Sequence, residues 1–301
     1  MSSISQLATR NSQLLAWHGW NLAVPDTWNP VKVDGTWDQG LMLLADMHQA
    51  KLGLRWRRAK RGDPEKWADR ALKDEVGNLA AKQAAGFAMP ESTDWKVSKL
   101  YADTDPPGRD VWVGWSNQSS RVLEIVHHVK TRDTFFEQQV LPTVSDTPES
   151  GEQAWSIFDL SCKTPSGWKM QWFRLNAGDL TLSFKSKKKS ANVRQIGPAT
   201  LALTRLKLDD WIGQIDKSLR KIYREIDDLS DTTLDLPNRT LTGRRGVLYR
   251  KRRLFWAVMF TKKLDVIGVH DEVRNRLFIA QGDDEPAMRE MLKSMGWAKK
   301  A

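Results

Sequence analysis

The sequence repeats itself across most of its length, and this repeat constrains the fold more than any other feature. In each half, an apolar segment ends at a proline with a tryptophan three residues further on: Pro25 with Trp28, and Pro165 with Trp168. Other landmarks recur in the same order, at offsets of 138 to 144 residues: Gly40 and Gly178, Trp67 and Trp211, Trp112 and Trp256. One structural unit repeated in tandem gives such spacing. We therefore interpret the chain as a tandem duplication, with chance similarity between two α+β stretches as the alternative.

Each repeat contains one segment with the pattern of a long helix. In the first, Asp63-Pro64-Glu65 combines an N-capping oxygen, a proline at the first helical position and an acid near the positive end of the helix dipole. This start predicts a helix over residues 64–85. In the second repeat, apolar residues recur at helical spacing from Trp211 to Ile226, which predicts a helix over residues 209–228.

The other apolar runs have the length and alternation of strands, with shorter helices expected near residues 133–141 and 284–296. The predicted fold class is α+β, with two tandem similar domains over residues 1–147 and 148–301. Each domain is expected to be an antiparallel sheet packed on one long helix, plus a short C-terminal helix. Six tryptophans are expected to be mostly buried anchors of the two cores: Trp28, Trp67, Trp112, Trp168, Trp211 and Trp256.

Composition limits the class of protein and its compartment. A single cysteine, Cys162, excludes an internal disulfide framework and a zinc site built from several cysteines. No apolar run reaches the roughly 18–20 residues of a membrane helix, and the first residues lack the pattern of a secretory signal. We therefore expect a cytoplasmic protein without membrane association. Residues 1–150 hold 18 Lys and Arg against 19 Asp and Glu, whereas residues 151–301 hold 29 against 18, a net charge of +11.

The two proline–tryptophan strand ends carry a family resemblance. Leu22-x-x-Pro25-x-x-Trp28 and the looser Leu160-x-x-x-x-Pro165-x-Gly167-Trp168, with the elements that follow each, resemble the α/β fold of the PsbP and DcrB families. The first motif departs from the usual pattern, because Thr27 stands where a glycine precedes the tryptophan. Members of this fold do different jobs, so no functional residue carries over. The resemblance implies a binding or scaffolding domain.

The sequence offers little for catalysis. His127 and His128 are adjacent in a predicted strand, so their side chains point to opposite faces and cannot jointly bind one metal ion. His270 lies in a similar strand of the second repeat, and a half-buried strand histidine is the preferred interpretation of all three. Cys162 is expected to be a buried structural thiol. The chain has no glycine-rich phosphate loop, nucleophile elbow or HExxH motif. We predict no catalytic centre, no cofactor and no metal site.

The second repeat carries an unusual density of cations around one predicted hairpin: Arg244, Arg245, Arg250, Lys251, Arg252, Arg253, Lys262 and Lys263. Such a cluster is typical of a surface that binds nucleic acid or another polyanion. The alternative is a solvated face neutralised by the nearby acids Asp227, Asp228, Asp231 and Asp235. A second lysine-rich segment, FKSKKKS at residues 184–190, is predicted to be a hairpin turn whose lysines protect a sheet edge.

These observations favour a non-catalytic adaptor that acts through protein–protein contacts, with polyanion binding by the basic hairpin as the alternative. In the first repeat, Arg55 and Arg57 are expected on one strand face with Trp56 on the other. The second repeat has no equivalent of this segment. The two repeats are thus expected to share a fold and differ in surface chemistry, one serving as platform and the other as contact face.

Overall fold

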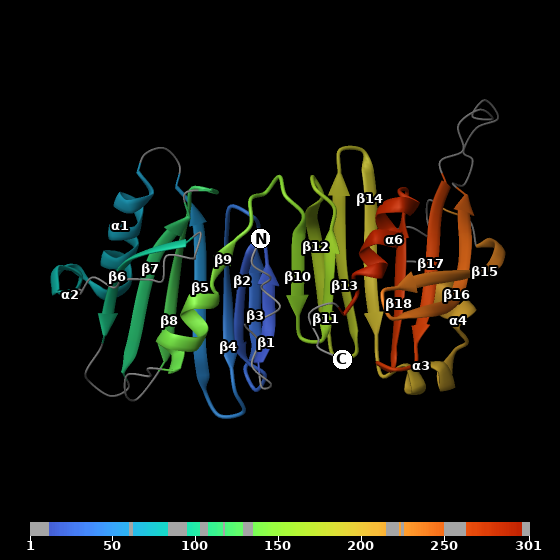
Figure 1. Cartoon of the computed structure of the whole chain (residues 1–301), viewed down its shortest axis with the longest axis horizontal. Helices are drawn as coiled ribbons and strands as arrows, with labels where there is room; N and C mark the ends of the chain where they lie inside the picture. Colours follow the sequence, from blue (N-terminus) through green and yellow to red (C-terminus); the bar gives the residue numbers. More distant parts are fainter. Residues whose placement is uncertain are drawn as a thin grey trace. The chain divides into compact units, whose positions relative to one another are not determined.

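The computed structural model describes residues 12–59, 63–83, 95–102, 108–116, 118–128, 135–214, 223, 226–249 and 263–296. The chain divides into two units, of which the first ends at Ser161 and the second begins at Cys162. Their described parts consist mainly of three antiparallel sheets (Figure 1). The predicted class, α+β with each sheet packed on one long helix, is therefore wrong, because the longest described helix has only 13 residues.

The main sheet of the first unit has six strands in the order β3-β4-β5-β8-β7-β6. Strands β3, β4 and β5 form a meander. Strand β8 pairs with β5, and β7 and β6 follow it, so the last three strands run through the sheet in reverse order. Strands β4 and β8 carry apolar residues on both faces, so both faces of the sheet have to be covered. The strands are β3 (Asn29–Gly35), β4 (Gln39–Ala45), β5 (Ala50–Arg58), β6 (Trp95–Ala102), β7 (Arg109–Ser116) and β8 (Arg121–His128).

Helix α1 (Pro64–Val76) covers one face of this sheet and begins where the sequence predicts. The carboxylate of Asp63 accepts a hydrogen bond from the backbone N–H of Glu65 at 3.0 Å, and Pro64 occupies the first helical position. The predicted helix over 64–85 is nevertheless interrupted. Gly77 has φ +84°, a conformation that glycine adopts at little cost, and the chain continues as the short helix α2 (Asn78–Gln83).

The opposite face of the sheet is covered by a hairpin and by a short helical segment. Strands β1 (Ser12–Trp17) and β2 (Trp20–Pro25) turn at His18 and Gly19, both with positive φ. They belong to the second sheet, of order β11-β10-β1-β2-β9. Its other strands are β9 (Ser145–Asp146), β10 (Gln153–Ile157) and β11 (Leu160–Thr164), and the helical turns are η2 (Phe136–Val140) and η3 (Leu141–Thr143).

The second unit is built on a seven-stranded sheet of order β12-β13-β14-β18-β17-β16-β15. One face is covered by α3 and α4, whose Ile212 packs in the same cluster as Leu248 and Val266. The other face is covered by α6, whose buried side chains include Met288 and Met291. The elements are β12 (Lys169–Asn176), β13 (Asp179–Ser186), β14 (Lys189–Ile196), α3 (Ala199–Arg205), α4 (Leu208–Gly213), β15 (Asp227–Leu236), β16 (Arg239–Tyr249), β17 (Lys263–Asp271), β18 (Arg276–Gly282) and α6 (Glu285–Lys293).

The predicted second long helix, over residues 209–228, is not what the described residues form. Helix α4 ends at Gly213, and β15 already begins at Asp227. The part of that prediction over residues 215–222, 224 and 225 lies outside the described residues, as does the strand expected at 255–260 with Trp256. Among the other five tryptophans, Trp28, Trp112 and Trp168 are buried, whereas Trp67 and Trp211 are half-buried.

The two main sheets follow the same order, since β3, β4, β5, β8 and β7 have β12, β13, β14, β18 and β17 as their counterparts (Figure 1). Both edge strands carry a bulge at the same place, Val31 in β3 and Gln171 in β12, 140 residues apart. In the last hairpin the turn residues Ser120 and Asn275, both with positive φ, are 155 residues apart. The offset in this hairpin is therefore 155, not the 144 of Trp112 and Trp256.

Candidate interaction surface

The histidines proposed as remote candidates for chemistry lie in different environments. His127 is buried against the ring of Phe136, with ring centroids 4.3 Å apart, whereas His128 points to the opposite face and is half-buried. His270 is half-buried on β17. Within the described residues, no three His, Cys, Asp or Glu side chains gather closely enough to hold a metal ion.

Cys162 is completely buried on β11, and burial raises the pKa of its thiol. A thiol held in this protonated form is a poor nucleophile. Its environment is that of a small apolar core side chain.

The most elaborate polar cluster in the first unit was not found from the sequence. Arg121 is fully buried at the start of β8, where its guanidinium pairs with Asp146 and donates to the carbonyl oxygens of His18 (2.6 Å) and Trp37 (3.0 Å). Its plane lies over the rings of Trp37 and Trp20, at 3.9 and 4.8 Å from their centroids. The cluster joins two turns and two strands, and its donors are directed at protein groups. This geometry shows that Arg121 stabilises the fold by holding these turns and strands together.

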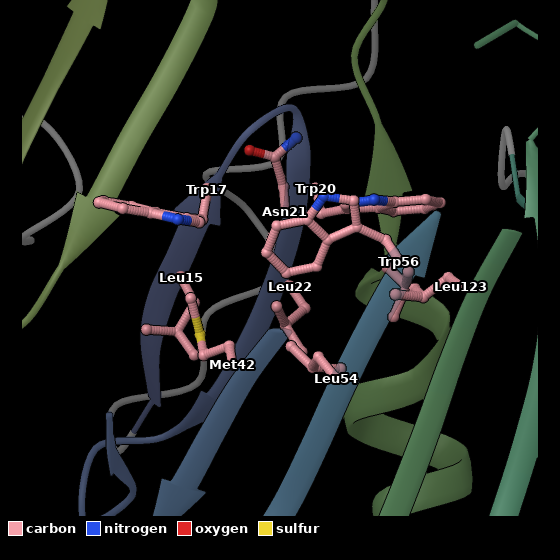
Figure 2. Close-up of a pocket in the computed structure, with 10 residues that line it drawn as sticks. Leu15, Trp17, Trp20, Asn21, Leu22, Met42, Leu54, Trp56 and Leu123 are labelled. Carbon is pink, nitrogen blue, oxygen red and sulfur yellow. The ribbon is translucent and has the colours of Figure 1, made fainter. Parts of the chain in front are cut away.

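A small cavity lies beside this cluster, between the β1–β2 hairpin and the main sheet. Its volume of about 10 Å³ is close to the minimum that one water molecule needs. Figure 2 shows that its walls are almost entirely apolar, with indole rings from three strands. A cavity of this size is a packing void of the core. It is lined by Leu15, Trp17, Trp20, Asn21, Leu22, Met42, Leu54, Trp56, Leu123 and Val144.

Ion pairs fix helix α1 to the sheet. Glu124 is buried on β8 between Arg57 (3.2 Å) and Arg55 (3.4 Å), and Glu75 of α1 pairs with Arg55 and with Arg109. Burial raises the pKa of Glu124, and the two arginines oppose that effect. As expected from the sequence, Trp56 points to the other face, where it is buried. The cations and acids of this network neutralise one another, so its role is to hold helix α1 against the sheet.

The basic hairpin that the sequence singled out is only partly described. Arg244 and Arg245 are neighbours on β16 and point to opposite faces, as strand residues do. Arg244 pairs with Asp209 of α4 (3.0 Å) and with Asp231, and Arg245 pairs with Asp265 (3.3 Å) and with Glu285 of α6. Lys263 is exposed at the start of β17. Arg250, Lys251, Arg252, Arg253 and Lys262 lie outside the described residues, so polyanion binding there stays a prediction.

The described surface that most resembles a binding site is the edge strand β12, which the sequence analysis did not single out. It pairs with β13 on one side and ends the sheet on the other. Trp172 is 42% exposed, and Met170, Phe173 and Leu175 are half-buried. Adjacent aromatic residues in one strand put an apolar ring on each face. That pattern, Trp172-Phe173 in a strand without proline, was the available signal.

Two other edges of the main sheets, β3 and β15, are better protected against pairing. Its counterpart β3 carries Pro30, which has no N–H to donate, together with the exposed charges Lys32 and Asp34. The opposite edge of the second sheet, β15, exposes Asp231 and Asp235. Charged residues and proline are the usual means of preventing edge-to-edge pairing. In β12 the central residues Met170, Trp172 and Phe173 bring neither proline nor charge.

Comparisons with known proteins do not place the chain in a family. No family model matches it, and no curated protein matches it. The solved structures that match include the immunity protein TplEi of T6SS from Pseudomonas aeruginosa, complexed with "L" peptide and in its apo form, both at 9% identity. The two matches cover 96% and 97% of this chain and 98% of the other, with TM-scores of 0.32 and 0.31. Such scores do not establish a shared fold, and the resemblance to PsbP and DcrB stays a prediction.

No helix in the described part of the chain is both long and apolar enough to cross a membrane. The predicted cytoplasmic location stays a prediction.

Proposed function

We propose that the protein is a non-catalytic adaptor that binds a partner protein through its second unit. The partner adds an extended segment to the open edge of β12. The observation that carries this proposal is an eight-residue edge strand with an exposed indole at its centre and apolar residues beside it. Backbone hydrogen bonds along such an edge supply affinity, and the alternate side chains supply specificity.

The charge of the second unit supports the same assignment of roles. Its excess of cations steers an acidic partner toward it, whereas the first unit is almost neutral. In the first unit, the buried charged side chains form ion pairs that hold the unit's own turns and helix in place. It serves in this proposal as the platform, and the second unit as the contact face.

Photo-crosslinking tests the proposal. A photo-reactive amino acid replaces Trp172 in the full chain, or Val31 in the equivalent strand β3, where the side chain is 61% exposed. We expect one protein to be joined from position 172 and not from position 31. The purified partner should then bind the Trp172→Ala chain at least about tenfold more weakly than the unaltered chain, because exposed tryptophans dominate many interfaces. Equal crosslinking from both positions, or an unchanged affinity, contradicts the proposal.

A further inference from the structure

The side chains along β12 are sorted by chemistry between the two faces of the sheet. Cross-strand partners lie on the same face, and Lys169, Trp172 and Arg174 are opposite Lys185, Ser183 and Thr181 of β13. The bulge at Gln171 places Lys169 and Trp172 on one face although they are three residues apart.

The other face of β12 is apolar. Met170, Phe173 and Leu175 are opposite Phe184, Leu182 and Leu180, which are buried. In a strand added to β12, every second side chain would lie on the face that carries Lys169, Trp172 and Arg174. The side chains between them would lie on the apolar face.

Further lysines lie at the end of the sheet where β12 begins. Lys169 and Lys185 are directly opposite each other, so two positive charges lie together at this end of the strand pair. The β13–β14 turn adds the exposed Lys187 and Lys188, and Lys187 has φ +53°. The corresponding turn in the first unit begins with Asp46, which pairs with Lys51. The cationic end is thus a property of the second unit alone.

From this arrangement, and resting on the proposed function, we infer that β12 binds an extended partner segment in which acidic residues alternate with apolar ones. Carboxylates at every second position meet Lys169, Lys185 and Arg174, and the intervening residues contact Phe173 and Leu175. Arg174 also pairs with Asp179 at 3.5 Å, so the two lysines and the neighbouring turn supply most of the attraction. A second copy of β12 is disfavoured, because its sequence KMQWFRLN brings two cations and no acid. A nucleic acid has no peptide backbone with which to add a strand to this edge.

A peptide selection tests the inference without assuming a partner. A random 12-residue phage library is selected against the full chain, with counter-selection against the Trp172→Ala chain. The enriched peptides should carry Asp or Glu at alternate positions with apolar residues between them. Their binding should weaken as salt rises, since contacts between exposed charges are screened.

Two matched triple variants then measure the role of the lysines. Lys185→Gln with Lys187→Asn and Lys188→Gln should weaken the best peptide about tenfold, equivalent to about 1.4 kcal/mol. Lys32→Gln with Lys66→Gln and Lys73→Gln removes the same charge from exposed positions of the first unit and should leave the affinity within about twofold.

The outcomes separate the two proposals. Enrichment of neutral or basic peptides that require Trp172 would overturn the acidic segment and leave the proposed function standing. Enrichment that is indifferent to Trp172, or no enrichment, would contradict both. Self-association of the chain that Trp172→Ala abolishes would replace the peptide by a second copy. Heparin or single-stranded DNA that displaces the peptide and binds the unaltered and Trp172→Ala chains equally would identify a polyanion site instead.

Discussion

The edge strands β3 and β12 occupy the same place in two sheets of the same order, yet we propose partner binding for β12 alone. Both carry a bulge. Both also follow a turn in which the backbone N–H of a tryptophan donates to the carbonyl oxygen of a proline, Trp28 to Pro25 (3.0 Å) and Trp168 to Pro165 (3.3 Å). The β3 edge is blocked by proline and mixed charge. The comparison teaches that the common fold sets where an edge lies, and that a few residues decide whether it can be used.

The buried charges give the largest contrast between the units. Arg121→Met should destabilise the first unit by about 3–5 kcal/mol, because Asp146 would stay buried without its partner. Its positional counterpart Arg276 is half-buried and donates to the carbonyl oxygen of Asn275 at 2.9 Å, so Arg276→Met should cost about 1–2 kcal/mol. Urea denaturation followed by tryptophan fluorescence measures both. Equal losses would show that the Arg121 cluster is no special fastening.

Acid should act on the first unit through His18. Burial, and then the charge of Arg121, lower the pKa of His18 from 6.5 to about 4. Between pH 6.5 and pH 4, His18 is protonated in the unfolded chain but remains neutral in the folded chain. The free energy of unfolding therefore falls as the pH falls from 7 to 4. The loss is about 3 kcal/mol.

The variant His18→Asn isolates this effect, since asparagine tolerates the positive φ of the turn. Its unfolding free energy should change less between pH 7 and pH 4 than that of the unaltered chain. The turn between β10 and β11, which also has positive φ, holds Phe158, which does not titrate. An identical pH dependence in the two chains would refute the assignment to His18.

The helix ends differ in a way that glycine substitutions can measure. Gly77 has positive φ and open space around it, so Gly77→Ala should destabilise the first unit by about 1–2 kcal/mol through backbone strain alone. Gly213, at the end of α4, also has open space but lacks positive φ, and Gly213→Ala should be neutral or stabilising by up to about 1 kcal/mol. Thermal unfolding decides between these signs, and a stabilising Gly77→Ala would show that the helix was not ended by this residue.

The smallest effects on stability are expected at the edges themselves. Trp172→Lys and Val31→Lys both alter exposed positions and should each change the unfolding free energy by less than about 1 kcal/mol. Only Trp172→Lys should reduce peptide binding. A large loss of stability from Trp172→Lys would mean that the indole belongs to the core.

Local rules predicted the local features. The start of α1 at Asp63 and the lysine turn between β13 and β14 depend on neighbouring residues, so they were predictable from the sequence. The length of the helices was not, because Gly77 fits a helical pattern until its backbone angle is known. Arg121 pairs with Asp146 from another strand, and nothing near it in sequence distinguishes it from a surface arginine. An edge exists only once strand order is set, which is why β12 was overlooked.

Amide hydrogen exchange of the full chain, with and without the best acidic peptide, tests the central claim most directly. If β12 receives an added strand, residues 169–176 should exchange at least about tenfold more slowly with the peptide bound, because their outward N–H groups become hydrogen-bonded. Residues 29–35 of β3 should be unaffected. Unchanged exchange in β12, or equal slowing in both strands, would contradict the account.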